Sequence, residues 1–145
     1  MRKNQRRTYW IATGFVAFIM TISGGMAITR AAPMMKALAH LGYPPYFSDL
    51  LGLGKLVGVC VLLAPGLVKW KEWAYVAFSI VVLSACWSHL QSGDGWMALE
   101  PLVTLGALVI SYRTRPASRR FVYPKGEQAG EEMGLGRPGV GYSGD

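Results

Sequence analysis

The sequence predicts an all-α polytopic membrane protein, a bundle of four transmembrane helices with a short interfacial helix between the first and second spans. Composition is the first reason, because 52% of the 145 residues are hydrophobic. The apolar residues also gather into four runs of roughly 17 to 20 residues, which as helices approach the thickness of a bilayer's hydrocarbon core, about 30 Å. Finally, basic residues cluster at the ends of these runs, as in proteins oriented by the positive-inside rule.

The order of segments follows from these runs. A basic segment at 1–8 precedes the transmembrane domain at 9–112, and the basic and then Gly-rich tail at 113–145 is expected to be disordered. The four spans are predicted at 9–28, 50–68, 73–90 and 96–112.

The second and third spans form the hairpin around which the chain is organised. Both are apolar on all sides apart from Lys55, His89 and a few serines, which is typical of helices surrounded by lipid or protein. The charged segment 69–72 is expected to form the turn between them.

The first span is expected to be retained, because its apolar run exceeds the roughly 7 to 15 residues of a signal-peptide core. Small residues recur on it at helical spacing, and such a seam lets a second backbone approach closely. These residues are Gly14, Ala17, Thr21 and either Gly24 or Gly25. The spacing of Gly54 and Gly58 predicts a similar seam on the second span, and Gly52 and Gly58 share the face of Lys55, which is expected to face the bundle.

Residues 31–47 are the longest connection between spans, and they predict a short amphipathic helix lying in the membrane interface. Its apolar residues fall near one face of a helix: Met34, Met35, Leu38 and Leu41. Pro44 and Pro45 then force a non-helical turn, since they lack amide hydrogens. The pair Ser48-Asp49 is expected to cap the second span.

The distribution of positive charge predicts the orientation. With four spans, twelve of the fifteen lysines and arginines lie on the side that carries both termini and the 69–72 turn. The opposite side has only Arg30 and Lys36, and Lys55 lies inside a span. Both termini are therefore expected in the cytoplasm.

Five polar residues near the outer end of the predicted bundle are the candidate site: Lys55, His89, Glu100, Asp49 and Asp94. Lys55 and Glu100 lie at about equal depth on seams of small residues, so we expect an ion pair between them inside the bundle. The five residues would outline one outward-opening pocket for a substrate, a proton or a quinone headgroup. The alternative is structural, with Lys55 extending to the interface and His89 bonding a carbonyl at a helix end.

A second group marks the inner boundary and is predicted to be structural. Glu72 would be satisfied by Lys69, Lys71 and the amino end of the third helix. Trp73 and Tyr75 are expected to be interfacial anchors.

Several functions find no support in the residues. The histidines at 40 and 89 have no metal or haem spacing, so no metal is expected, and no cofactor is evident. Cys60 and Cys86 lie at different depths, so we expect no disulfide between them. No phosphate-binding loop and no nucleophile beside a base can be found. The basic residues flank spans instead of covering a soluble face, so nucleic acid is not an expected partner.

Taken together, several stretches resemble the DoxX-like family of small bacterial four-helix membrane proteins, in the same order and spacing from about residue 8 to 123. The stretches are Leu41-Gly42-Tyr43-Pro44-Pro45-Tyr46, Leu51-Gly52, Lys55-Leu56-Val57-Gly58, Leu62-Leu63-Ala64-Pro65-Gly66, Lys71-Glu72-Trp73-Ala74-Tyr75, Ser88-His89-Leu90, Gly93-Asp94, Arg115-Pro116 and Ser118-Arg119-Arg120. The resemblance implies a multi-pass protein of the bacterial cytoplasmic membrane, with the fold implied more firmly than any activity. Positions that match the family's recurring polar and aromatic residues are Lys55, Glu72, Trp73, Tyr75, Ser88 and His89, and the resemblance carries no catalytic assignment for them.

Three functional hypotheses follow. The family takes its name from a membrane subunit of a thiosulfate:quinone oxidoreductase, so the resemblance implies a non-catalytic subunit or accessory component of a quinone-linked redox complex. Quinone would then be the ligand, and a redox subunit would be the partner beside the lipid bilayer. The alternatives are a small carrier or ion-conducting bundle, and a structural or assembly protein. The sequence indicates neither a reaction nor an oligomeric state.

Overall fold

The computed structural model describes residues 3–120, which form five α-helices and one 3-10 turn, with no β-strand in that range. The elements are α1 (Lys3–Ile28), α2 (Ala32–His40), α3 (Tyr46–Leu63), α4 (Val68–Gln91), α5 (Leu99–Thr114) and η1 (Ala117–Arg119). The disorder predicted for the tail concerns mainly residues outside the described range. Within that range the basic segment after α5 forms η1, and its arginines bind the helices beside it.

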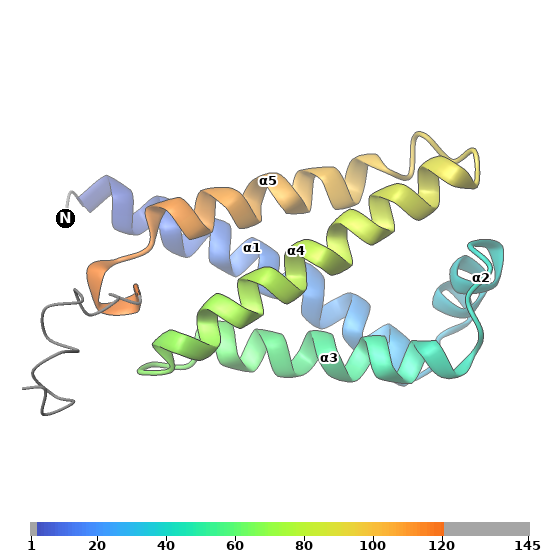
Figure 1. Ribbon diagram of the computed structural model, residues 1–145, viewed down its shortest axis with the longest axis horizontal. Helices are drawn as coiled ribbons and strands as arrows, with labels where there is room; N and C mark the ends of the chain where they lie inside the picture. Colours follow the sequence, from blue (N-terminus) through green and yellow to red (C-terminus); the bar gives the residue numbers. More distant parts are fainter. Residues whose placement is uncertain (1–2, 121–145) are drawn as a thin grey trace, which may run out of the picture.

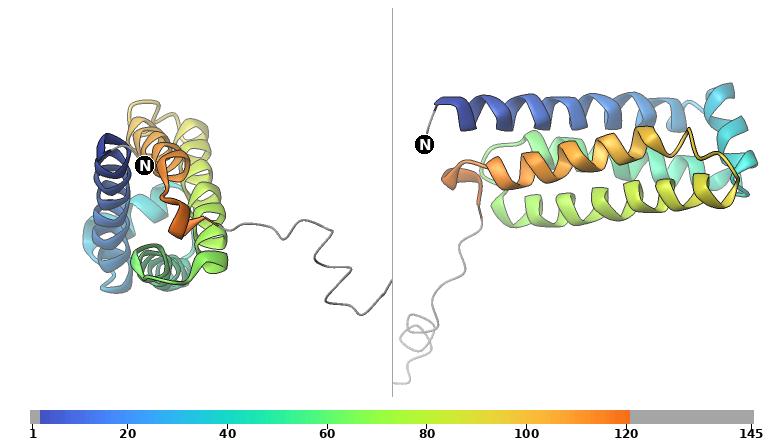
Figure 2. Two further views of the ribbon diagram at one scale, coloured as in Figure 1. Left: turned by 90° about the vertical axis from the view of Figure 1, so that its left-hand side faces the viewer. Right: turned by 90° about the horizontal axis from the view of Figure 1, so that it is seen from above.

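The four long helices lie side by side, and the short helix α2 lies at one end of them (Figure 1). α1 packs against α3 and α5, and α4 packs against the same two helices from the opposite corner (Figure 2). The amino end of α1, the α3–α4 turn and η1 lie together at one end, here called the η1 end. The opposite end, with α2 and the α4–α5 loop, is called the α2 end.

Three of these helices, α1, α3 and α4, are long and apolar enough to cross a membrane. α5 has 16 residues and is about 24 Å long, shorter than the hydrocarbon core of a bilayer. Large apolar side chains point outward on all four helices, including Ile11, Leu53, Ile80 and Val103. Such a surface is suited to lipid and not to water. The prediction of an all-helical membrane protein is confirmed at this level.

The interior is filled by apolar side chains from all four long helices: Val16, Ala17, Met20, Val59, Leu62, Tyr75, Phe78, Val82 and Leu108. Two glycines allow this close packing. A Cβ at Gly52 would lie 2.8 Å from the carbonyl oxygen of Gly24, so α1 and α3 cross backbone to backbone at this pair. A Cβ at Gly58 would lie 2.6 Å from the ring of Phe78 on α4.

The predicted seams were therefore only partly right. Gly24, Ala17 and Gly58 face neighbouring helices, but Gly14 and Thr21 are exposed and a Cβ at Gly54 would meet nothing within 4 Å. Spacing identifies a face of a helix but does not say which face meets a partner. On α3, Gly52 meets α1 and Gly58 meets α4, as expected for the face that they share with Lys55.

The turn of the central hairpin also lies elsewhere than predicted. α3 ends at Leu63, and the turn is formed by 64–67, where Gly66 takes a positive φ of 78°. The charged segment 69–72 lies inside the first turns of α4. Pro65 and Gly66 end the helix because proline has no amide hydrogen and glycine tolerates the left-handed region.

The start of α3 also differs from the prediction, which placed a cap at Ser48-Asp49. The helix begins at Tyr46, directly after Pro44 and Pro45, and no side chain caps it. Ser48 therefore lies within the helix, where its hydroxyl is buried and donates to the Ala27 carbonyl at 2.7 Å. Proline is favourable just before or within the first turn of a helix, so the two prolines start α3 without a capping side chain.

Candidate functional site

A partly open cavity of about 220 Å³ lies beneath α2, lined by side chains from α2 and from all four long helices. α2 contributes an apolar face to it, with Leu38 buried and Met34 and Leu41 beside it. The remaining walls are also mainly apolar, with Met20 and Val82 between the cavity and the interior. α2 thus acts as a cover, and its amphipathic pattern has a partner surface inside the molecule.

Three polar contacts hold this cover in place. Nε2 of His40, at the end of α2, lies 2.6 Å from Oδ2 of Asp94 in the α4–α5 loop. The Tyr43 hydroxyl is hydrogen-bonded to that of Ser88 on α4 at 2.8 Å. The cover is therefore fixed to α4 and to the loop that follows it.

The third contact joins the two ends of the connection. Arg30, just before α2, donates to both carboxylate oxygens of Asp49 on α3, at 3.0 and 2.5 Å. Hydrogen bonding and the negative charge of Asp49 raise the pKa of Arg30. Arg30 has a positive φ of 49°, uncommon for an arginine, so the ion pair forms at a tight bend between α1 and α2.

Two polar side chains, Lys55 and His89, line the cavity. Lys55 on α3 donates from Nζ to the Ser23 hydroxyl of α1 at 3.0 Å. Nδ1 of His89 on α4 is buried and has no hydrogen-bond partner within residues 3–120. Its nearest carboxylate is Asp94, at 3.7 Å. A buried polar atom without a partner is costly, so a ligand that offers it a hydrogen bond would be favourable here.

The structure brings together part of the predicted outer pocket. Lys55, His89 and Glu100 all line the cavity. Asp94 lies beside it, against His89 and His40. Asp49 is turned away to Arg30.

The predicted ion pair between Lys55 and Glu100 is not formed. No salt bridge joins them among the described residues, because Lys55 binds Ser23 and Glu100 is largely exposed. Equal depth on two helices does not bring two side chains together when the helices occupy opposite corners, as α3 and α5 do here.

A second polar group, at the η1 end, was not anticipated. Arg115 is 5% exposed and binds the Glu72 carboxylate at 2.6 and 3.4 Å. Its guanidinium also lies over the rings of Tyr112, at 3.9 Å, and Tyr75, at 5.0 Å. The Tyr75 hydroxyl bonds that of Ser111 at 2.7 Å. An arginine stacked on two aromatic rings and paired with a carboxylate closes this end of the molecule.

These contacts correct the predicted inner boundary. Glu72 pairs with Arg115 and not with Lys71, whose ammonium is buried and turned to backbone carbonyls. Tyr75 is 3% exposed and belongs to the interior, so it is no interfacial anchor. Trp73 is 71% exposed and faces outward. No spacing distinguished Arg115 from the other members of its basic cluster, and only the fold separates them.

Two cations also complete the carboxyl end of α3. Lys71 donates from Nζ to the carbonyls of Val61, at 3.0 Å, and Ala64. Arg119 in η1 donates to the carbonyls of Leu62, at 3.3 Å, and Leu63, at 3.4 Å. The last carbonyls of a helix have no partners within it, and here all four are satisfied by side chains that the fold brings from other segments.

Comparison with known proteins identifies the family of this chain. No curated protein and no solved structure matches the chain. The model of the DoxX-like family matches residues 11–111, from the first turns of α1 to the last turn of α5. The matched region contains the cavity, its cover and Glu72. The resemblance suggested by the sequence is thereby confirmed, and the chain belongs to the DoxX-like family.

Proposed function

We propose that this DoxX-like membrane protein holds a quinone headgroup in the cavity beneath α2, as a non-catalytic subunit or accessory component of a quinone-linked redox complex. The observation that carries the proposal is the pair of polar side chains at the wall of an apolar cavity, Lys55 and His89, whose buried Nδ1 has no hydrogen-bond partner within residues 3–120. A quinone ring is apolar on its faces and has carbonyl oxygens at its edge. Those oxygens accept hydrogen bonds, and they gain negative charge on reduction, which an ammonium group stabilises.

The size of the cavity supports a ring and not a larger ligand. Its volume of about 220 Å³ exceeds the roughly 150 Å³ of an engineered cavity that binds benzene. It falls below the roughly 300 to 1,000 Å³ of pockets for drug-sized molecules. An isoprenoid tail would therefore lie outside the cavity, among the lipid chains.

The charge distribution supports a position for this site in the membrane. We infer that all four long helices cross the bacterial cytoplasmic membrane with both termini in the cytoplasm, because twelve of fifteen lysines and arginines belong to one side in that topology. α2 would then lie in the outer interface. The short helix α5 can be accommodated by local thinning of the bilayer.

The carrier hypothesis has no comparable support. Residues of the apolar interior separate the cavity from the polar group at the η1 end. On α4, Phe78 lies between Val81 and Tyr75, and on α5, Leu108 lies between Thr104 and Ser111. A polar path through the molecule would require this interior to open.

Titration with a short-chain quinone tests the proposal on protein purified in mild detergent. Lys55→Met should weaken binding by about tenfold or more, since a hydrogen bond to a charged group contributes about 1.5 to 3 kcal/mol. His89→Phe should weaken it by about two- to tenfold, since an ordinary hydrogen bond contributes about 0.5 to 1.5 kcal/mol. Lys36→Gln, at an exposed lysine on α2 outside the cavity, is the matched control and should bind normally. Equal binding by all four proteins would contradict the proposal.

The redox complex is tested separately. Membranes are solubilised gently, the protein is isolated, and bound quinone and co-purifying subunits are identified. Recovery of quinone together with a soluble redox subunit would support the proposal. Recovery of the chain with neither would contradict the proposed role in a complex.

A further inference from the structure

The η1 end carries a groove that the cavity under α2 does not explain. Lys3, Arg6, Arg7, Trp10 and Ile11 line this groove, about 420 Å³ in volume, along the first turns of α1. Their spacing places them on one face of the helix. Three basic side chains therefore lie around one concave surface, which their aliphatic stems help to form.

These charges are not neutralised by the described part of the protein. Residues 3–120 include four carboxylates, and no carboxylate in this range forms an ion pair with Lys3, Arg6 or Arg7. Glu72, the only one of the four at the η1 end, is already bound by Arg115. All three side chains are exposed, so their donors are available to an anion.

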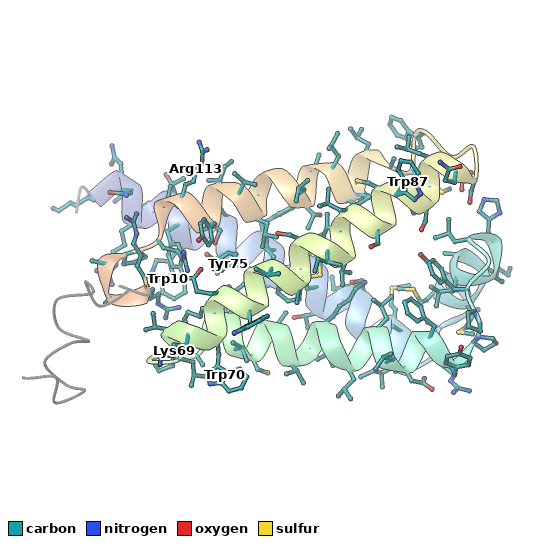
Figure 3. All side chains as sticks on the ribbon, viewed as in Figure 1. Trp10, Lys69, Trp70, Tyr75, Trp87 and Arg113 are labelled. Atoms are coloured by element: carbon teal, nitrogen blue, oxygen red, sulfur yellow. The ribbon has the colours of Figure 1, made fainter. Side chains whose placement is uncertain are left out.

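The floor of the groove is held in place. The ring of Trp10 meets that of Tyr9 edge to face at 5.4 Å. The Arg119 guanidinium lies 4.8 Å from the Trp10 ring and is itself fixed by the carbonyls of Leu62 and Leu63. Arg119 thus adds a fourth positive charge beside the groove. Figure 3 shows Trp10 and Arg113 at this same end of the molecule.

An apolar stripe continues from the groove along the outer face of α1. Ile11, Phe18 and Ile22 are 73, 62 and 46% exposed, and they follow Lys3 and Arg7 at helical spacing. An anion with a hydrocarbon chain could bind both parts, with its phosphate at the basic residues and its chain along the stripe. Free phosphate or nucleic acid would use only the basic part.

We propose that this groove is a binding site for an anionic phospholipid, with the phosphate held by Lys3, Arg6 and Arg7 and an acyl chain along Ile11 and Phe18. Basic clusters at the end of a membrane helix favour anionic headgroups by about 1 kcal/mol for each charge near the surface. The site lies at the opposite end of the molecule from the cavity, so the test of lipid binding does not depend on the result for quinone binding.

The test is a titration of the full chain in mild detergent with phosphatidylglycerol, with phosphatidylcholine and with inorganic phosphate, followed by native mass spectrometry. Phosphatidylglycerol should bind most tightly. Arg6→Gln and Arg7→Gln should each weaken it by about fivefold, and Lys36→Gln, which removes one charge at the α2 end, should leave binding unchanged.

Three outcomes would overturn the proposal. Equal affinity for phosphatidylglycerol and phosphatidylcholine would mean that charge is not recognised. Inorganic phosphate binding as tightly as phosphatidylglycerol would mean that the stripe contributes nothing. An equal loss in Lys36→Gln and Arg6→Gln would place the anion elsewhere. All three substitutions are at exposed positions, and thermal unfolding checks that each variant is folded.

Discussion

Arg115 binds Glu72 at the η1 end, with Nη1 donating to Oε1 at 2.6 Å and Nη2 to Oε2 at 3.4 Å. The pair joins the start of α4 to the segment that follows α5. Removing one partner leaves the other charge uncompensated, so Arg115→Gln should destabilise the protein by about 3 kcal/mol. Glu72→Gln should have at least as large an effect, because it leaves the buried guanidinium of Arg115 without its carboxylate.

A double-mutant cycle on the two residues checks this relationship through thermal unfolding in detergent. The double variant Glu72→Gln/Arg115→Gln should lose less stability than the sum of the two single variants, because the residues interact directly. Strict additivity would mean that the ion pair contributes nothing.

The second prediction concerns the stability of a Lys71 variant. The buried Lys71 ammonium satisfies the carbonyls of Val61 and Ala64, and Lys71→Met leaves both without a partner. Each unsatisfied carbonyl costs about 1 to 3 kcal/mol, so unfolding should require clearly less heat or denaturant. Lys36→Met, at an exposed lysine, is the control. Similar stability in the two variants would show that the carbonyls find other partners.

The third prediction concerns the crossing of α1 and α3. Gly52→Ala places a Cβ 2.8 Å from the Gly24 carbonyl oxygen, and the two backbones must separate at a cost of about 1 to 3 kcal/mol. Gly54→Ala meets nothing within 4 Å and should be neutral or slightly stabilising, because alanine favours a helix over glycine. Thermal unfolding of the two variants in detergent measures this difference in stability. A loss in Gly54→Ala as large as that in Gly52→Ala would contradict the assignment.

The fourth prediction concerns the cover of the cavity. Tyr43→Phe removes the hydrogen bond to Ser88, which contributes about 0.5 to 1.5 kcal/mol. Opening of α2 should therefore become about 2- to 12-fold more frequent, measured as faster hydrogen exchange of its backbone amides. Tyr46→Phe is the matched control, since this tyrosine is 70% exposed. Unchanged exchange in Tyr43→Phe would show that other contacts hold the cover.

Apolar runs and prolines made much of the fold predictable. The long apolar segments required helices, since only helices satisfy their own backbone in lipid. Pro44, Pro45 and Pro65 mark where helices begin and end. The helix of 31–47 was also recognisable, because Met34 and Leu38 share one face. These features depend on neighbours in the chain, so the sequence is sufficient to predict them.

The partners of the charged residues were not predictable in the same way. Lys55 binds Ser23, Glu72 binds Arg115, and Arg119 reaches the end of α3. Each contact joins segments far apart in the chain, and the choice among several equivalent charges depends on which helices occupy adjacent corners. Helical periodicity and charge position determined that this chain forms apolar helices with basic ends. Only the packing of those helices decided which polar groups meet, because a long flexible side chain can reach any of several partners until its helix is fixed.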